Sequence, residues 1–243
     1  MPAHVAPVLV QAHRRRRSFL YNAPQTVTGL RLWLKADALP LGHGDPVALW
    51  PDASGSGNDL AQSNAAKRPT FRINQLNGRP VVRFDGVDDT LFKVALGGFA
   101  ATQGHTIMAV LNPTAAVSFG MAVVTRPGFT ELRQTLAGGV AQWLAPSGST
   151  LVNGLATLTG SWKVWTGCYA VAGQRLELFI NGTSQGFATD AGTLAVGDGY
   201  LGSRADSFYW LGDMAEVLVY DAALAVADRQ TVESYLTAKY SLT

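Results

Sequence analysis

Hydrophobic and polar residues alternate in short runs along most of the chain, and Gly, Asn, Asp and Pro separate the runs. Between residues 30 and 36 apolar side chains at even positions alternate with Arg31, Trp33 and Lys35 at odd positions. A period of two predicts a strand that turns one face toward a core. Similar runs predict strands at 79–84, 106–111, 120–125, 162–169, 175–180 and 214–220.

The sharpest local signal is a hairpin. Leu176, Leu178 and Ile180 alternate up to Asn181 and Gly182, and residues 183–187 can return antiparallel. The dipeptide Asn-Gly readily takes the positive φ angles of a type I′ turn, so we expect two strands joined there.

One segment near the C-terminus has helical rather than strand periodicity, and we predict a helix over 225–238. Asp228 in its first turn favours the helix dipole. We expect the helix to pack across a sheet edge or loop with its apolar side, which carries Leu224, Val232, Tyr235, Leu236 and Tyr240. Because helices do not alternate with strands elsewhere, the pattern predicts an all-β fold, an antiparallel two-sheet sandwich spanning residues 29–243.

Composition narrows the class of protein. The chain has 243 residues, which is ordinary for a single β-domain. Charged residues make up 15% and hydrophobic residues 47%, against about 25% charged in an average protein, and this excludes a disordered chain. No apolar run reaches the roughly 18 residues of a membrane-spanning helix, so we expect no membrane partner.

The first part of the chain is basic and lacks a core-forming pattern. Residues 1–28 are expected to form an extended arm that binds a partner protein through Arg14, Arg15, Arg16, Arg17, Phe19 and Tyr21. The remainder is mildly acidic, which argues against a specific nucleic-acid partner. The arginines follow rather than precede an apolar stretch, so we expect no signal peptide. A single cysteine, Cys168, allows no internal disulfide and agrees with synthesis in a reducing cytoplasm.

Several longer segments together resemble one family. They are 32–37 (LWLKAD), 50–60 (WPDASGSGNDL), 77–89 (NGRPVVRFDGVDD) and 212–221 (GDMAEVLVYD), followed by YLTAKY at 235–240. In this order they resemble the laminin-G-like, concanavalin A-like jelly rolls of bacterial and bacteriophage proteins, over residues 30–242. The resemblance implies a jelly roll, a fold that serves lectins, glycan hydrolases, adhesion modules and virion parts alike.

Catalytic motifs are not found. The hydrolases of that superfamily use a Glu-x-Asp-x-x-Glu strand, but Glu131, Glu177, Glu216 and Glu233 are far apart and none begins that motif. The Gly-x-Gly-x-x-Gly match at 197–202 lacks a following apolar helix and is interpreted as a turn. We therefore expect no enzymatic activity and assign no catalytic residue.

Calcium is the cofactor that the sequence leaves open. Two turns offer the hard oxygen ligands that calcium prefers, at Asp52, Asn58, Asp59, Asp85, Asp88 and Asp89. The alternative is that these side chains cap the turns by accepting backbone N–H groups.

Aromatic residues beside Gly- and Ser-containing loops are the candidates for a contact surface with a glycan or a protein. These are Trp143, Tyr209 and Trp210, whereas Trp33, Trp50, Trp162 and Trp165 lie in or beside apolar strands and are expected in or near the core.

Two functions are consistent with these features. The favoured hypothesis is a non-enzymatic structural protein of a bacteriophage virion, either a capsid decoration or a tail-associated protein. It would be made in the host cytoplasm, anchored to capsid or tail subunits by its arm, and form a homo-oligomer or part of a larger assembly. The alternative is a carbohydrate-binding lectin module, with or without calcium, that contacts cell-surface glycans.

Overall fold

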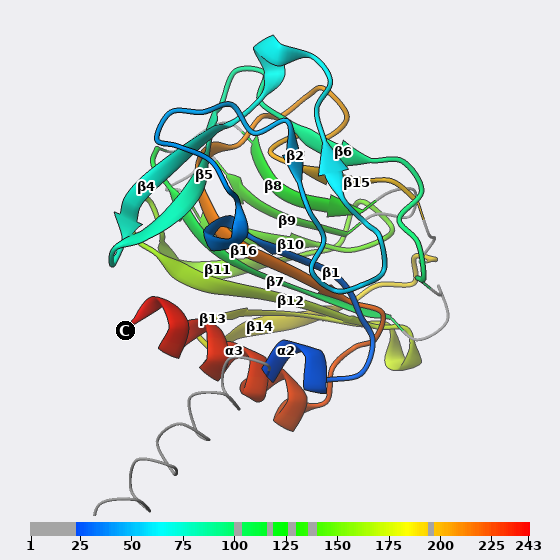
Figure 1. Ribbon diagram of the computed structural model, residues 1–243. Coiled ribbons are helices and arrows are strands. Elements are labelled where there is room, and N and C mark those ends of the chain that lie inside the picture. The colour runs from blue at the N-terminus through cyan, green and yellow to red at the C-terminus, as the bar shows by residue number, and fades with distance from the viewer. Residues whose placement is uncertain (1–22, 100–103, 116–118, 126–129, 136–139, 194–196) are drawn as a thin grey trace, which may run out of the picture.

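The computed structural model describes residues 23–99, 104–115, 119–125, 130–135, 140–193 and 197–243. Within these residues two antiparallel sheets pack face to face, and one long helix lies beneath them (Figure 1). This architecture confirms the predicted all-β two-sheet jelly roll with a C-terminal helix.

Sheet A holds eight strands in the described part of the chain, in the order β14-β13-β12-β7-β16-β5-β4, and β1 pairs with the second half of β16. Its strands are β1 (Leu30–Lys35), β4 (Thr70–Leu76), β5 (Arg79–Asp85), β7 (His105–Pro113), β12 (Lys163–Ala170), β13 (Arg175–Ile180), β14 (Thr183–Thr189) and β16 (Leu211–Tyr220).

Sheet B also holds eight strands in the described part, in the order β11-β10-β9-β8-β15-β6-β3-β2. Its strands are β2 (Leu49–Trp50), β3 (Leu60–Ala61), β6 (Leu91–Lys93), β8 (Phe119–Thr125), β9 (Thr130–Thr135), β10 (Val140–Leu144), β11 (Leu151–Thr157) and β15 (Gly199–Leu201). The helical segments are α2 (Ala23–Thr26), η1 (Ala36–Ala38), η2 (Ala65–Lys67), η3 (Ala172–Gln174) and α3 (Val226–Tyr240).

The main core lies between the sheets, where alternate residues of each strand point inward. Its largest fully buried side chains include Trp50, Phe84, Trp143, Trp165 and Trp210. Burying an aromatic side chain of this size stabilises the folded state by about 1.5–3 kcal/mol.

A second apolar layer lies between sheet A and α3. Trp33, Met108 and Leu218 of the sheet belong to the same buried cluster as Val232 and Leu236 of the helix. The expectation that the helix packs on an edge or loop was therefore wrong. Residues that alternate away from the main core of sheet A are themselves apolar, and α3 removes them from water.

A β-bulge in β16 separates the two halves of that strand. Met214 pairs with Leu111 and Glu216 pairs with Val110, so the intervening Ala215 is an extra residue opposite β7. Both Ala215 and Leu218 belong to the layer under α3, while Met214 and Val217 belong to the main core.

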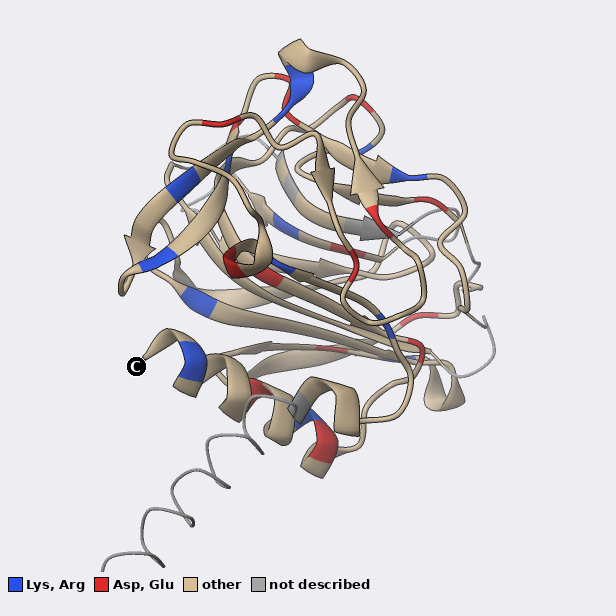
Figure 2. Ribbon diagram, in the orientation of Figure 1, with Lys and Arg blue, Asp and Glu red and all other residues tan. Residues whose placement is uncertain are grey.

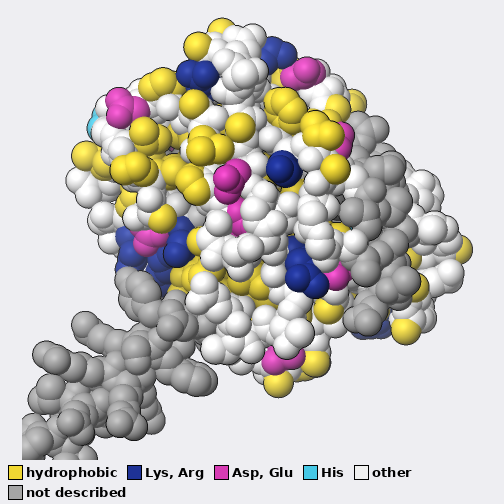
Figure 3. All heavy atoms as spheres, turned by 45° about the vertical axis from the view of Figure 1, so that its right-hand side comes forward, with side chains coloured by type: hydrophobic (Ala, Val, Ile, Leu, Met, Phe, Trp, Pro, Cys, Tyr) yellow, Lys and Arg dark blue, Asp and Glu magenta, His cyan; other side chains and the backbone are white. Residues whose placement is uncertain are grey.

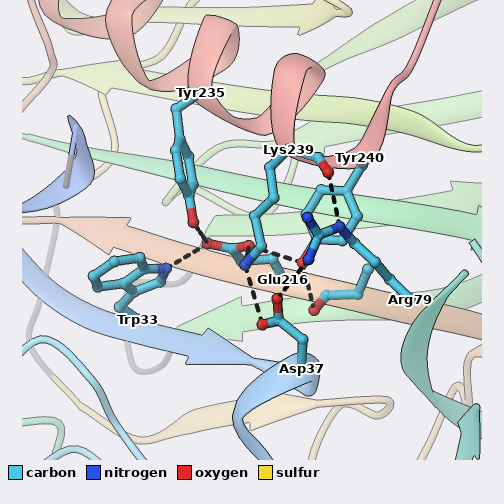
Figure 4. A network of polar contacts seen from close by, with 8 residues as sticks. Trp33, Asp37, Arg79, Glu216, Tyr235, Lys239 and Tyr240 are labelled. Atoms are coloured by element: carbon cyan, nitrogen blue, oxygen red, sulfur yellow. Dashed lines mark hydrogen bonds and ion pairs between the residues drawn. The ribbon is translucent and has the colours of Figure 1, made fainter. Parts of the chain in front are cut away.

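A buried polar network ties α3 to sheet A at this bulge (Figure 4). The carboxylate of Glu216 has no exposed surface and accepts from Trp33 Nε1 at 2.5 Å, Tyr235 Oη at 3.0 Å, Lys239 Nζ at 2.7 Å and Tyr240 Oη at 2.8 Å. Because a buried carboxylate requires such compensation, Glu216 serves the fold here and is not available to a ligand.

The sequence placed residues 23–28 in an extended arm, and the structure corrects this part of the boundary. Ala23–Thr26 form one helical turn, and Tyr220 Oη donates to the carbonyl of Pro24 at 3.1 Å. Val27 is buried in the layer under α3, which explains why this segment folds back on the domain. Residues 1–22, with Arg14, Arg15, Arg16, Arg17, Phe19 and Tyr21, lie outside the described residues.

Two turns predicted from the sequence have different outcomes in the structure. Asn181 and Gly182 have φ angles of 48° and 76° and join β13 to β14, which confirms the hairpin. Residues 199–201 form strand β15 and not the predicted turn, because they pair with both β6 and β8. No helix in the described ranges is long and apolar enough to cross a membrane.

Candidate functional site

The first predicted calcium turn is held by its own side chains. Asp52 accepts from the backbone N–H groups of Trp33, Ser54 and Asn58 at 2.8–3.0 Å, and Asp59 accepts from that of Asp52 at 2.7 Å. The amide nitrogen of Asn58 donates to the carbonyl of Arg31 and to that of Gly97, and its amide oxygen accepts from the Gly97 N–H. These contacts are the capping role that the sequence left as the alternative.

The second predicted turn brings its three carboxylates together. Oxygen atoms of Asp85, Asp88 and Asp89 all lie within 4.8 Å of one another. Burial, with the neighbouring charges of Asp85 and Asp88, raises the pKa of Asp89 to about 6. Calcium takes 6–8 oxygen ligands, and Asp85 Oδ1 already accepts from the Val87 N–H at 2.8 Å. Calcium binding therefore stays a prediction. Of the six ligands predicted from the two turns, the three in this turn lie close together.

Two of the three predicted contact aromatics are buried, which corrects that assignment. Trp143 and Trp210 have no exposed surface. The alternation of β10 points Trp143 into the core, where Nε1 donates to the Cys168 carbonyl at 3.1 Å, and Trp210 packs edge-on against Trp165. Proximity to Gly- and Ser-containing loops therefore did not place these rings at the surface. Tyr209 is partly exposed, and partial burial together with the negative charge of Asp206 raises the pKa of its hydroxyl.

Near Tyr209 the structure shows a hollow of about 300 Å³, at the end of the molecule that carries η2. We call it the aromatic hollow; it is lined by Gln62, Ser63, Asn64, Lys67, Thr90, Phe92, Tyr200, Ala205 and Asp206. Its volume falls within the range of about 300–1,000 Å³ that is usual for small-molecule sites. Figure 3 shows apolar side chains with charged groups among them on this upper part of the molecule.

Two aromatic rings form the floor of the aromatic hollow. Phe92 of β6 and Tyr200 of β15 are paired in register, and their rings are nearly parallel, 6.1 Å apart with an interplanar angle of 21°. Leu91 and Leu201 beside them are buried in the core, so the alternation turns both rings away from it. Phe92 remains 36% exposed, which offers a face to a ligand.

Polar groups stand around these rings. Lys67 Nζ and Asp206 Oδ1 form an ion pair at 3.0 Å, and this hydrogen bond raises the pKa of the Lys67 ammonium. Gln62 Nε2 donates to the Thr90 carbonyl at 3.1 Å, and its amide oxygen accepts from the Asn64 N–H at 3.0 Å. The rim thus combines a charged pair with neutral hydrogen-bonding groups, and backbone groups hold Gln62 in position.

The segment 203–209 forms one wall of the hollow and has an unusual backbone. Ala205, Asp206 and Phe208 have φ angles of 47°, 62° and 56°, which are unfavourable for residues with a Cβ. The surrounding structure holds the start of the segment, because Ser203 Oγ contacts Thr90 Oγ1 at 2.7 Å and Arg204 pairs with Glu131 at 2.5 Å. Strain of this kind concentrates at binding sites, where it positions a side chain.

Phe92 and Tyr200 were not predicted from the sequence. Each lies in a strand of three residues, too short to show alternation, and their strands are more than a hundred positions apart in sequence. The available signal was local: Leu91-Phe92 and Tyr200-Leu201 each place an aromatic residue beside a leucine. Their pairing in sheet B is a long-range feature that no local pattern reveals.

Comparison with known proteins agrees with this fold. The family model of the concanavalin A-like lectin/glucanases superfamily matches residues 84–228. No curated protein sequence matches the chain significantly.

Three solved structures illustrate the likeness. A sialidase of Trypanosoma rangeli, in complex with 2,3-difluoro-KDN, shares 12% identity at a TM-score of 0.64 over 97% of this chain; the chain spans 40% of that sialidase. The receptor binding domain of botulinum neurotoxin D shares 12% sequence identity at a TM-score of 0.60. The alignment covers 85% of this chain and 52% of the toxin domain's chain. The third structure is domain 4 of AbnA, a GH43 extracellular arabinanase from Geobacillus stearothermophilus, in complex with arabinotriose. It shares 13% sequence identity at a TM-score of 0.59, and the alignment covers 84% of this chain and 97% of that domain.

Identities this low show a shared fold, and the family match covers more than half of the sequence. With its two antiparallel sheets and lectin-like jelly roll, this chain belongs to the concanavalin A-like lectin/glucanase superfamily.

Proposed function

We propose that this chain is a non-enzymatic saccharide-binding module whose ligand lies in the aromatic hollow. The observation that carries the proposal is the parallel pair Phe92 and Tyr200, partly open to solvent and surrounded by amide, hydroxyl and charged groups. A sugar ring presents an apolar face to an aromatic ring and hydroxyl groups to a polar rim, so both kinds of contact are available here.

The state of the glutamates supports binding rather than hydrolysis. A glycosidase needs two carboxyl groups that flank the scissile bond, one as acid and one as nucleophile or base. Here Glu131 is buried between Arg133 and Arg204, and Glu233 pairs with Arg229 at 2.6 Å. Glu216 is enclosed under α3, as described above.

Binding can be tested by calorimetric titration after screening the full chain against immobilised neutral and acidic oligosaccharides. Replacing Phe92 with Ala is expected to weaken binding of the selected saccharide about tenfold or more, the equivalent of one lost stacking contact. Phe187→Ala is the matched control, because Phe187 is also exposed but lies on β14 at the edge of sheet A. Equal affinity of the wild type and Phe92→Ala would refute the assigned site, and release of reducing ends would refute the non-enzymatic role.

Calcium enters the same experiment as a separate variable. If Asp85, Asp88 and Asp89 hold the ion, saccharide affinity or thermal stability rises with added calcium and falls with a chelator. Asp88→Asn is expected to abolish that response, and a response that persists in this variant contradicts the predicted ligands.

We propose further that the module is displayed on a bacteriophage particle. The observation that favours this role is the run of four arginines, Arg14 to Arg17, followed by Phe19 and Tyr21. Such a segment suits binding to acidic grooves between capsid or tail subunits. Deleting residues 1–22, which retains α2, is expected to abolish incorporation into particles while thermal unfolding of the domain is unchanged. Normal incorporation of the truncated chain would refute anchoring by the arm.

A further inference from the structure

A second hollow of about 440 Å³ lies beside the aromatic hollow. We call it the arginine hollow; it is lined by Ala66, Arg68, Thr70, Arg72, Arg83, Phe84, Asp85, Asp89, Thr114 and Leu211. The consecutive residues Ala66 and Lys67 of η2 line different hollows, as do Asp89 and Thr90.

Strand alternation gathers the cations of this hollow. Phe71 of β4 and Phe84 of β5 belong to the main core, so Arg72 and Arg83 turn toward the opposite side of sheet A. Thr70 pairs with Arg83, which brings the two strands' outward positions together. Figure 2 shows basic segments on β4 and at the turn above it.

Arg68 and Arg72 differ from every other arginine in the described part of the chain. All of the others form an ion pair with a carboxylate, including Arg83, whose Nε lies 2.6 Å from Asp213 Oδ1. Arg68 instead donates to the carbonyls of Gln62 and Ser63, at 2.8 and 2.9 Å. Arg72 contacts only a ring nitrogen of His43, at 3.4 Å, and its buried Nε has no protein partner.

The same hollow also contains oxygen acceptors. Asp85 and Asp89 use one carboxylate oxygen each for backbone N–H groups, Asp85 Oδ1 for Val87 and Asp89 Oδ2 for Asp85. Their second oxygens are acceptors suited to hydroxyl groups. A ligand that satisfies the whole hollow therefore carries an oxyanion for the guanidinium groups and hydroxyl groups for the carboxylates.

We infer that the arginine hollow binds an acidic sugar, with its carboxylate or sulfate ester at Arg68 and Arg72. Guanidinium groups bind such oxyanions through charge-assisted, often bidentate hydrogen bonds. This inference rests on the proposed saccharide binding and narrows its ligand to an anionic chain. The anionic residue occupies the arginine hollow.

Calorimetric titration of the full chain with paired probes tests this assignment. The carboxylate arm compares oligogalacturonate with its methyl ester, and the sulfate arm compares a sulfated galactan oligosaccharide with the unsulfated one. In at least one arm the anionic probe is expected to bind about tenfold or more tightly than its neutral partner. Arg72→Gln is expected to remove that preference, and Arg175→Gln, which alters an exposed arginine on β13, is expected to keep it.

The outcomes separate the two proposals. Equal binding of charged and neutral probes, with loss of both in Phe92→Ala, refutes the acidic ligand and retains the aromatic site. A charge preference that survives both Arg68→Gln and Arg72→Gln refutes the arginine hollow. A preference that needs Arg72 but not Phe92 refutes the aromatic site alone, and no binding of any probe counts against both.

Discussion

Charged groups differ in their pairing at two places on or beside sheet A. Under α3, the carboxylate of Glu216 has four donors and no exposed surface. Beyond the helix, Arg68 and Arg72 have no carboxylate partner and line a hollow. The first set of charges stabilises the fold, and the second set is the one that we propose for an anionic ligand. It also separates residues whose replacement unfolds the protein from those whose replacement changes binding.

The largest effect is expected at the enclosed carboxylate. Glu216→Ala leaves the Lys239 ammonium buried without one of its carboxylate partners, and we expect a loss of about 3–5 kcal/mol in the free energy of unfolding. Urea denaturation measures it. Glu177→Ala, at the partly exposed pair with Arg175, is expected to cost less than about 1 kcal/mol. Similar losses in both variants would contradict the distinction drawn here.

The next largest effect on stability is expected from protonation of the buried side chain of His105. Burial lowers the pKa of His105 to about 4, against about 6.5 when unfolded. As the pH falls, the unfolded chain therefore binds a proton before the folded protein does. The free energy of unfolding is unaffected above about pH 6.5 and decreases by about 3 kcal/mol as the pH falls to about 4. His105→Gln should not show this contribution when its unfolding free energy is measured across the same range; an unchanged pH profile would show that His105 is not its source.

Asp89, between the two hollows, is expected to act with the opposite sign. Its folded pKa of about 6 exceeds the unfolded value of about 3.9, so its ionisation destabilises the protein as the pH rises through this interval. Asp89→Asn keeps an acceptor for the Asp85 N–H. At pH 7.5 we expect the unfolding free energy of this variant to exceed that of the wild type by about 2 kcal/mol, and near pH 4 we expect the two to be equal. A variant less stable than the wild type at pH 7.5 would reverse the assignment.

The smallest effect is expected at the aromatic floor. Phe92→Ala should lower the unfolding free energy by less than about 1 kcal/mol, since the ring is partly solvated. Trp143→Ala, in the same sheet but fully buried, is expected to cost about 3–5 kcal/mol. Urea or thermal unfolding measures the stability of both variants. A large loss of unfolding free energy in Phe92→Ala would identify Phe92 as a core residue.

The sequence predicted the elements that depend on residues close to one another in the chain. Asn181 and Gly182 define their hairpin by backbone preference, and the apolar side of α3 is evident from its periodicity. The sites depend on pairing between distant segments, as where Tyr200 meets Phe92 or Arg83 meets Thr70. Trp143 was assigned to the surface because its neighbours are loop residues, whereas strand register determines that it points inward.

The extra residue in β16 links the two regions compared above. Asp213 lies on one side of the bulge and supports Arg83 in the arginine hollow, while Glu216 lies on the other and holds α3. Met214 faces the main core, whereas Ala215 and Glu216 both lie on the side of α3, because the extra residue places two successive side chains on one face. Deleting Ala215 would leave Met214 and Glu216 consecutive, still opposite Leu111 and Val110, so both halves of the strand would keep their faces. The deletion would instead remove the Ala215 side chain from the layer under α3, together with the carbonyl that accepts from Tyr240 Oη at 3.3 Å.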